Sequence, residues 1–295
     1  AGSEKIENIS SADLIFISGD PGQMFQGPHW KMAVAHNALI GLYNSNNPLA
    51  GKISIQGVSS GKLVRAVSSA GRINQGELIE GGGNIPVKVL MSPGESFLLH
   101  LSAISPGAGT SQPGMKVSGM EELVSEVNKD PDAIAFCLVT DIIKEGKCIL
   151  PENVKILPVD RNNNGRLDSF EHIYDNPESL LRGIWIGKYP QELCGTIYAV
   201  SAGNPEKSQA AGFLLWIMNE GGRFFAGTGY TELASVEKEA NIRMLAPSAS
   251  PVTGTSEPFL SGFLLIAIIL VTGGMLITAL TVRLFTSPGS NIQDT

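Results

Sequence analysis

The run Ala133-Ile-Ala-Phe-Cys-Leu-Val139 is apolar throughout and has the length of a β-strand. Four more runs of strand type lie on either side of it, at residues 13–18, 32–43, 85–91 and 196–200. Stretches with helical periodicity separate these runs. Strands that alternate with helices are typical of a sheet covered by helices, so we expect an α/β fold.

The helices are placed by cap residues and by apolar side chains that recur every three or four positions. We expect each apolar stripe to face the core. The predicted stripes are Leu63, Val64 and Val67 after Ser59 or Ser60; Met120, Leu123, Val124 and Val127 after Ser118; Leu180, Leu181, Ile184 and Trp185 after Asn176 and Pro177; and Ala210, Phe213, Leu214 and Ile217 before Gly221 and Gly222.

The composition is that of a globular protein, with 43% hydrophobic residues, 17% charged residues and a net charge of -7. Lys and Arg are scattered singly, whereas binding to a phosphate backbone needs them clustered. We therefore exclude nucleic acid as a partner. Because the first residue is Ala1 rather than Met, we expect that a leader was removed and that the protein is exported.

The three cysteines allow at most one disulfide. Cys137 lies within the apolar run quoted above, so we expect a buried thiol there. If any pair is bridged, the candidate is Cys148 with Cys194.

The C-terminal region contains a segment with the properties of a transmembrane helix. From Pro258 to Val282 no residue is charged, and Leu, Ile, Val and Phe dominate. A helix of about 20 residues crosses a bilayer core, and a charge at its centre would cost about 2.5–3.5 kcal/mol. The alternative is a buried core helix, but such helices are usually shorter and have a polar face. We expect residues 259–282 to span the inner membrane once, with the lipid bilayer as a partner.

The flanks of this segment predict its orientation. Arg283 follows directly, so the positive-inside rule places residues 283–295 in the cytoplasm and the large domain in the periplasm. Within the span, Gly273 and Gly274 either admit a neighbouring helix or are simply tolerated in lipid.

Two segments are predicted to be irregular connections. Residues 246–258 combine Pro with small polar residues and predict an extended tether, so the folded domain covers residues 1–245. Residues 105–114 are rich in Gly and Pro and predict a mobile loop at a cleft.

The segment Asp160-Arg-Asn-Asn-Asn-Gly-Arg-Leu-Asp-Ser-Phe-Glu171 matches the twelve-residue calcium loop of EF-hands. The expected ligands are the side chains of Asp160, Asn162, Asn164, Asp168 and Glu171 and the backbone carbonyl of Arg166. Gly165 permits the sharp turn, and Leu167 anchors the loop to the core. With three carboxylates and no second EF-hand in the sequence, we expect a structural Ca²⁺ site. The alternative is an Asn-rich turn that binds no metal.

Short motifs along residues 11–245 resemble the phosphate-binding periplasmic receptors of ABC importers. They are Ser11-Ala-Asp-Leu-Ile-Phe-Ile-Ser18, Val34-Ala-His-Asn-Ala38, Asn44-Ser-Asn-Asn-Pro48, Val58-Ser-Ser-Gly-Lys-Leu63, Ala133-Ile-Ala-Phe136, Gly187-Lys-Tyr-Pro190, Ile197-Tyr198, Ala211-Gly-Phe-Leu-Leu-Trp-Ile217 and Gly229-Tyr-Thr-Glu-Leu233. Their order and spacing agree with that family. The resemblance implies a two-lobed, type II binding-protein fold with a ligand cleft between the lobes.

The resemblance also implies where a small anion would bind. Ser18 and Asp20 match the family's Ser and Asp loop, and Gly94, Glu95 and Ser96 stand at its ligand-binding turn. Members that hold phosphate have a Ser/Thr-bearing first strand, which this chain starts too late to include, and an Arg with a Ser-Gly-Thr turn. Here no Arg is nearby, and Glu95 opposes an anion at a helix N-terminus. We therefore expect phosphate not to be held in the family manner.

The sequence is compatible to different degrees with three classes of function: an interaction module, a solute receptor and an enzyme. The leading hypothesis is a non-catalytic, membrane-anchored periplasmic binding or interaction module, fixed in an envelope complex, because a diffusing receptor needs no membrane helix. The resemblance suggests a TonB-type proton-driven motor as that complex, with other inner-membrane subunits as partners. The alternative is an anchored receptor that presents phosphate or another oxyanion to an ABC importer. An enzyme is disfavoured, because the four histidines lack metal-ligand spacing and no nucleophile elbow or phosphate loop is present.

Overall fold

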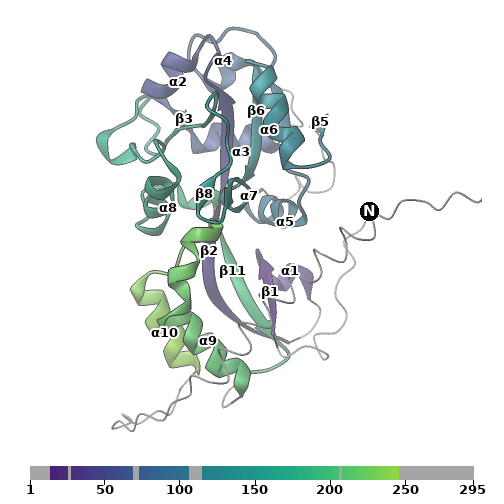
Figure 1. The fold of residues 1–295 in the computed structure, drawn as a ribbon, viewed down its shortest axis with the longest axis vertical. Helices are drawn as coiled ribbons and strands as arrows, with labels where there is room; N and C mark the ends of the chain where they lie inside the picture. The colour runs from purple at the N-terminus through teal and green to yellow at the C-terminus, as the bar shows by residue number, and fades with distance from the viewer. Residues whose placement is uncertain (1–13, 26–27, 69–72, 106–114, 206–207, 246–295) are drawn as a thin grey trace, which may run out of the picture. The chain divides into compact units, whose positions relative to one another are not determined.

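The computed structural model describes residues 14–25, 28–68, 73–105, 115–205 and 208–245 (Figure 1). They belong to one compact unit, Ala1–Pro247, which is separate from a second unit, Ser248–Thr295. The predicted tether 246–258, membrane segment 259–282, tail 283–295 and loop residues 106–114 lie outside the described residues. Within the described ranges, no helix is long and apolar enough to cross a membrane.

A sheet of seven strands runs through this unit, in the order β1-β11-β2-β6-β4-β5, with β9 also paired to β2. Strands β11, β6 and β9 are antiparallel to β2, whereas β4 and β5 continue the sheet parallel to β6. The bounds are β1 Ile15–Ser18, β2 Trp30–Asn44, β4 Lys88–Met91, β5 Met115–Lys116, β6 Ala133–Leu138, β9 Val154–Ile156 and β11 Cys194–Ser201. The α/β class and the five predicted strands are confirmed. The run at 133–139 forms β6, buried along its whole length, and Val139 already begins the next helix.

Helices cover this sheet, and two short strand pairs lie apart from it. The helices are α1 Pro21–Met24, α2 Ala50–Gln56, α3 Ser60–Ser68, α4 Gln75–Leu78, α5 Glu95–Ile104, α6 Met120–Lys129, α7 Val139–Ile142, α8 Pro177–Trp185, α9 Gln209–Asn219 and α10 Ser235–Leu245. The short 3-10 helices are η2 Ser169–Glu171, η3 Gln191–Leu193, η4 Gly221–Phe224 and η5 Ala226–Thr228. The strand pairs are β3 (Val58–Ser59) with β10 (Val159–Asp160), and β7 (Ile143–Lys144) with β8 (Lys147–Cys148).

Two separate hydrophobic cores divide the unit into two lobes. The larger core is built from residues between Ala38 and Leu193, and we call this part the larger lobe. The second core, around Met32, Val34 and Leu214, together with a small cluster around Ile17, makes the smaller lobe. Strands β2 and β11 pass from one core to the other and therefore connect the lobes (Figure 1).

Some predictions about side chains are wrong in detail. Trp185 is 49% exposed, because Leu180, Leu181 and Ile184 already fill the core side of α8 and Trp185, the last residue of the helix, lies outside the hydrophobic core. The N-cap of α6 is Gly119, not Ser118, whose side chain instead donates to Glu122 over 2.6 Å.

The cysteines are all free thiols. Cys137 is fully buried in β6, as predicted. Cys148 is exposed at the end of β8, whereas Cys194 is half-buried at the start of β11, with its thiol donating to the Pro190 carbonyl oxygen over 3.4 Å. The suggested bridge between Cys148 and Cys194 does not form.

Candidate functional site

Ser18 ends β1 at the junction between the lobes. It pairs with Ile197 of β11, and the next amide, of Gly19, donates to the Thr196 carbonyl oxygen over 3.1 Å. Only 9% of Ser18 is exposed, and its Oγ has no hydrogen-bond partner among the described residues. A buried hydroxyl without a partner costs free energy, so this atom requires a hydrogen-bond partner that the described residues do not supply.

Asp20 places a negative charge two residues further along. Its carboxylate caps α1 by accepting from the Gly22 amide at 3.2 Å, and it accepts from Lys31 Nζ at 3.1 Å. Both contacts lower the pKa of Asp20, and the hydrogen bond from the Gly22 amide has the larger effect. The side chain is half-exposed, so it remains an ionised acceptor that a ligand can reach.

The predicted residues Gly94, Glu95 and Ser96 open helix α5. Gly94 is the N-cap and provides no side-chain hydrogen bond, and Glu95 is the first helical residue. Helix α5 lies beside β1 (Figure 1). Gly19 approaches the helix one turn from its start, since a Cβ added to Gly19 would lie 3.5 Å from the Leu99 carbonyl oxygen.

The structure therefore brings the two predicted segments together, but with an offset. Ser18 and Asp20 come from the smaller lobe, whereas α5 contributes Phe97 and Leu101 to the larger core. The loop of Ser18 faces the middle of α5, at Leu99, rather than its N-terminus at Gly94. The candidate site thus combines the buried hydroxyl of Ser18, the ionised carboxylate of Asp20 and helix α5.

A buried serine and a half-buried aspartate, which follow strands β4 and β6, were missed by the sequence analysis. Ser92 is 2% exposed, follows β4 directly and donates to Asp141, which follows β6. Burial is the main cause of the raised pKa of Asp141, although it also accepts from the Leu138 amide at 2.9 Å. Ligands often bind at the carboxyl ends of parallel strands. The position of Ser92 just after β4 and of Asp141 just after β6 could therefore have indicated them as candidate site residues.

The predicted calcium loop has the backbone turns that such a loop needs. Asn163 has φ 57° and Gly165 has φ 79°, both in the left-handed region. Leu167 is held at the end of α2, where its amide donates to the Ile55 carbonyl oxygen over 2.8 Å. A Cβ on Gly57 would come within 2.7 Å of the Leu167 side chain, so the loop is firmly seated.

The carboxylates of this loop are already engaged with hydrogen-bond donors. Asp160 and Glu171 are buried; Asp160 accepts from the amides of Asn164 and Gly165, and Glu171 from those of Arg161 and Asp168. Asp168 accepts from the side chains of Asn162 and Asn164, each at 2.8 Å. Among the described residues, no group of His, Cys, Asp and Glu forms a metal-binding cluster. Each carboxylate oxygen has a second acceptor site, so Glu171 could keep its backbone donors and still bind a cation.

Comparison with known proteins concerns the fold. No protein-family model and no curated protein sequence matches the chain. Among solved structures, a possible phosphate binding protein from Planctomyces limnophilus is similar, with a TM-score of 0.52 and 15% identity over 75% of this chain and 73% of that one. An ABC-type phosphate transport receptor from Vibrio cholerae has a TM-score of 0.52 and 14% identity, over 75% of this chain and 80% of that one. The chain thus has an α/β fold like that of the phosphate-binding, type II periplasmic binding proteins.

Proposed function

We propose that this protein is a non-catalytic receptor that binds a small, partly protonated oxyanion at the lobe junction beside Ser18, with phosphate as the first candidate. The observation that carries the proposal is the buried, unpaired Oγ of Ser18. It lies where the resemblance predicts a ligand contact. The similar solved structures are those of a possible phosphate binding protein and of a phosphate transport receptor, which supports the same class of ligand.

The charges at the junction select a particular kind of anion. Asp20 stays ionised and can accept a hydrogen bond, so it favours an oxyanion that keeps a proton, such as hydrogen phosphate, over fully ionised sulfate. Lys31 offsets part of the negative charge of Asp20 at 3.1 Å. Glu95, the first residue of α5, adds a negative charge that repels an anion, so we expect weaker binding than a site with a bidentate Arg would give.

A titration of the full chain with phosphate and with sulfate tests this proposal. Isothermal titration should detect phosphate with a Kd below about 10 μM, which corresponds to about -7 kcal/mol. Sulfate should bind at least about tenfold more weakly, because it presents no hydrogen to Asp20 at neutral pH. Absence of phosphate binding at millimolar concentration would reject the receptor.

A second candidate function is a fixed interaction subunit of an envelope complex. The apolar segment 259–282 supports it, because a receptor anchored by a spanning helix cannot diffuse to its partners. In this proposal the large domain is periplasmic, the tail is cytoplasmic, and other inner-membrane proteins, such as those of a TonB-type motor, bind the chain. Extraction of membranes with carbonate should leave the chain in the pellet, and gentle purification should recover stoichiometric membrane partners.

Calcium is proposed as a structural cofactor of the 160–171 loop. The support is the spacing of its oxygen-bearing side chains and the left-handed turns at Asn163 and Gly165. Bound there, the cation would join η2 to the end of β10 and stabilise the larger lobe without taking part in ligand binding. The change in melting temperature on chelation tests this site separately from the oxyanion site.

A further inference from the structure

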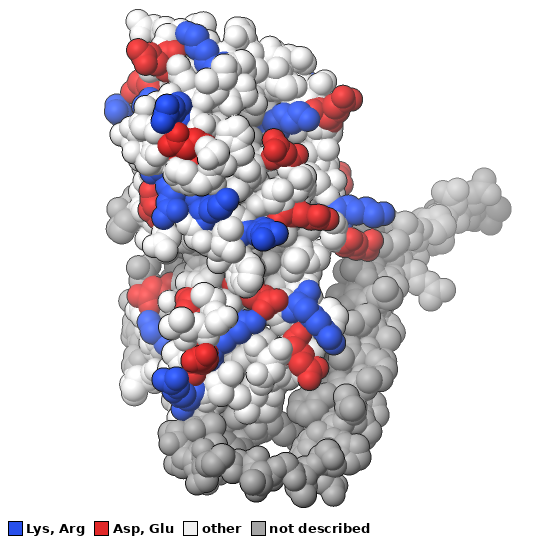
Figure 2. Space-filling view, turned by 90° about the vertical axis from the view of Figure 1, so that its left-hand side faces the viewer, with Lys and Arg blue, Asp and Glu red and all other residues white. Residues whose placement is uncertain are grey.

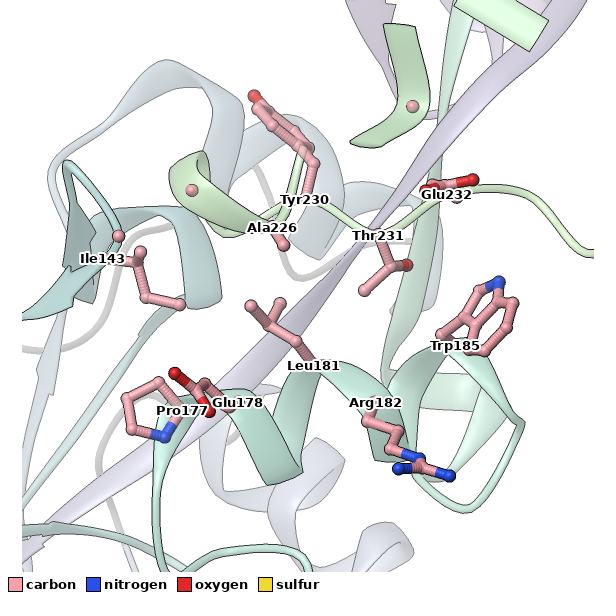
Figure 3. A pocket seen from close by; sticks show the side chains of 13 residues that line it. Ile143, Pro177, Glu178, Leu181, Arg182, Trp185, Ala226, Tyr230, Thr231 and Glu232 are labelled. Atoms are coloured by element: carbon pink, nitrogen blue, oxygen red, sulfur yellow. The ribbon is translucent and has the colours of Figure 1, made fainter. Parts of the chain in front are cut away.

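A cavity of about 450 Å³ lies between the lobes, away from Ser18. One wall is α8 with Ile143 of the larger lobe, and the other is the stretch 222–232 of the smaller lobe. Figure 3 shows Leu181 and Ala226 projecting toward each other across this space. We call it the α8 pocket. Its volume falls within the usual range for sites that hold small organic molecules, about 300–1,000 Å³.

The α8 pocket and Ser18 lie on opposite edges of the connecting strands. The order of strands is β1-β11-β2, and Ser18 ends β1. On the other edge of β2, His36 and Thr231 exchange two backbone hydrogen bonds, each of 2.9 Å. Thr231 lines the α8 pocket. An occupant of this pocket would therefore not compete with a ligand beside Ser18.

The walls of the α8 pocket are mostly apolar. Leu181, Ile143 and Ala226 present aliphatic groups, and the ring of Trp185 stands at one end of the cavity (Figure 3). Trp185 is 49% exposed, an unusual state for so large an apolar side chain unless something covers it. Burial of such surface is favourable at roughly 25 cal/mol per Å², so an apolar molecule gains by entering.

The charges around the pocket are balanced. Glu178 and Arg182 stand one turn apart on α8, and Glu232 is paired with Lys238. Figure 2 shows positive and negative side chains interspersed over the face on which α8 lies, rather than one sign gathered there. Since neither sign of charge is favoured, the lining fits an uncharged molecule.

Thr231 supplies an unused polar contact in this apolar lining. The residue is 5% exposed, and its Oγ1 has no hydrogen-bond partner among the described residues. Its backbone groups are already satisfied by His36. A rotation about the Thr231 Cα–Cβ bond would turn this buried hydroxyl to the cavity, where a single hydroxyl or carbonyl group on an apolar body matches it.

We propose that the α8 pocket is a second ligand site, which binds a small, uncharged, mostly apolar molecule whose one polar group hydrogen-bonds to Thr231. The occupant contacts both lobes and covers Trp185. Its binding is independent of whether an oxyanion binds beside Ser18.

The test uses 2-naphthol, two fused rings with one hydroxyl, as a probe and naphthalene as its matched partner without the hydroxyl. The full chain is labelled with ¹⁵N at its three tryptophans, and the indole N–H signal of Trp185 is identified by its loss in Trp185→Phe. The Trp185 signal should shift saturably with 2-naphthol, with a Kd below about 1 mM, while the Trp30 and Trp216 signals stay in place.

Two pairs of variants locate the probe. Ala226→Phe fills the pocket and should abolish the shift, whereas Val236→Phe, at a 79% exposed position on α10, should not. Thr231→Val removes only the hydroxyl and should raise the Kd of 2-naphthol by about fivefold without changing that of naphthalene. Unchanged Trp30 and Trp216 signals in each variant show that it is folded; should Ala226→Phe fail this control, Gly227→Leu takes its place.

Three outcomes would overturn the proposal. The first is a Trp185 signal that does not move at 1 mM probe. The second is a shift that survives in the filled variant, and the third is an equal effect of Thr231→Val on both probes. None of these depends on phosphate, so failure of the oxyanion site and failure of the α8 pocket are distinguishable.

Discussion

Gly229 lies so close to Thr140 that a Cβ added to it would come within 2.7 Å of the Thr140 Cα. Gly229 belongs to the smaller lobe and Thr140 to the larger one, in α7. Nearby, the Gly146 amide donates to the Gly227 carbonyl oxygen over 2.9 Å. The lobes therefore touch through backbone atoms on the side of the α8 pocket, and glycine is required for that contact.

Replacing Gly229 by Ala should destabilise the protein. The residue has φ 86°, which disfavours a side chain, and the new Cβ would meet backbone atoms of Thr140 that cannot move aside alone. We expect the free energy of unfolding to fall by about 2 kcal/mol or more, measured by urea denaturation. Gly227→Ala is the control: no atom lies within 4 Å of its added Cβ, so its change should stay within about 0.5 kcal/mol. Equal effects of the two variants would contradict this packing.

Because His100 is buried, we expect the free energy of unfolding to depend on pH. It is 1% exposed in α5, its Nε2 lies 3.1 Å from the Leu193 carbonyl oxygen, and its Nδ1 has no partner among the described residues. Burial is the main cause of the lowered pKa of His100, below its ordinary value of 6.5. Between these two pKa values the unfolded chain binds more protons than the folded chain, so stability is full above pH 6.5 and falls as the pH drops below it.

Urea denaturation from about pH 7.5 to about pH 5 measures this slope. His100→Gln keeps a donor for Leu193 but cannot take up the proton, so its free energy of unfolding should vary less steeply with pH than that of the native chain. His172→Gln, at an exposed position after η2, should retain the native slope. The prediction fails if both variants have the same slope.

The calcium loop predicts a response to chelation. At about 1 mM Ca²⁺ and a Kd of about 0.1 mM, the bound ion would stabilise the fold by about 1.4 kcal/mol. Chelation should therefore lower the melting temperature of the native chain, measured by circular dichroism. Asp160→Ala should abolish this sensitivity, whereas Asp175→Ala, exposed and outside the loop, should keep it. A native chain that melts equally with and without chelator binds no structural calcium.

The strands and the fold class could be predicted because they depend on local apolar runs. The run at 133–139 and the long run at 32–43 became β6 and the centre of β2; β6 lies in the larger core, and β2 contributes to both cores. The resemblance supplied the type II arrangement, which no single run could indicate. Trp185 was misplaced because the helical stripe was extended by one residue at the C-terminal end of α8, where the ring lies outside the core.

The binding features were harder to predict, because they arise from contacts between distant segments. Ser18 and Asp20 were found by their motif, but the approach of their loop to Leu99 depends on how the lobes meet. Ser92 and Asp141 lie far apart in sequence and are joined only by neighbouring strands. Thr231 has no sequence signature at all, since its importance comes from a buried hydroxyl that lacks a partner.

The proposed receptor function depends most on the buried hydroxyl of Ser18 as a ligand contact. Phosphate titration of the native chain, of Ser18→Ala and of Ser54→Ala, an exposed serine on α2, tests it by calorimetry. We predict micromolar binding to the native chain and to Ser54→Ala, and a Kd raised about tenfold or more in Ser18→Ala, as expected for loss of a hydrogen bond to a charged ligand. Phosphate that binds all three proteins equally, or none of them, would contradict the assignment.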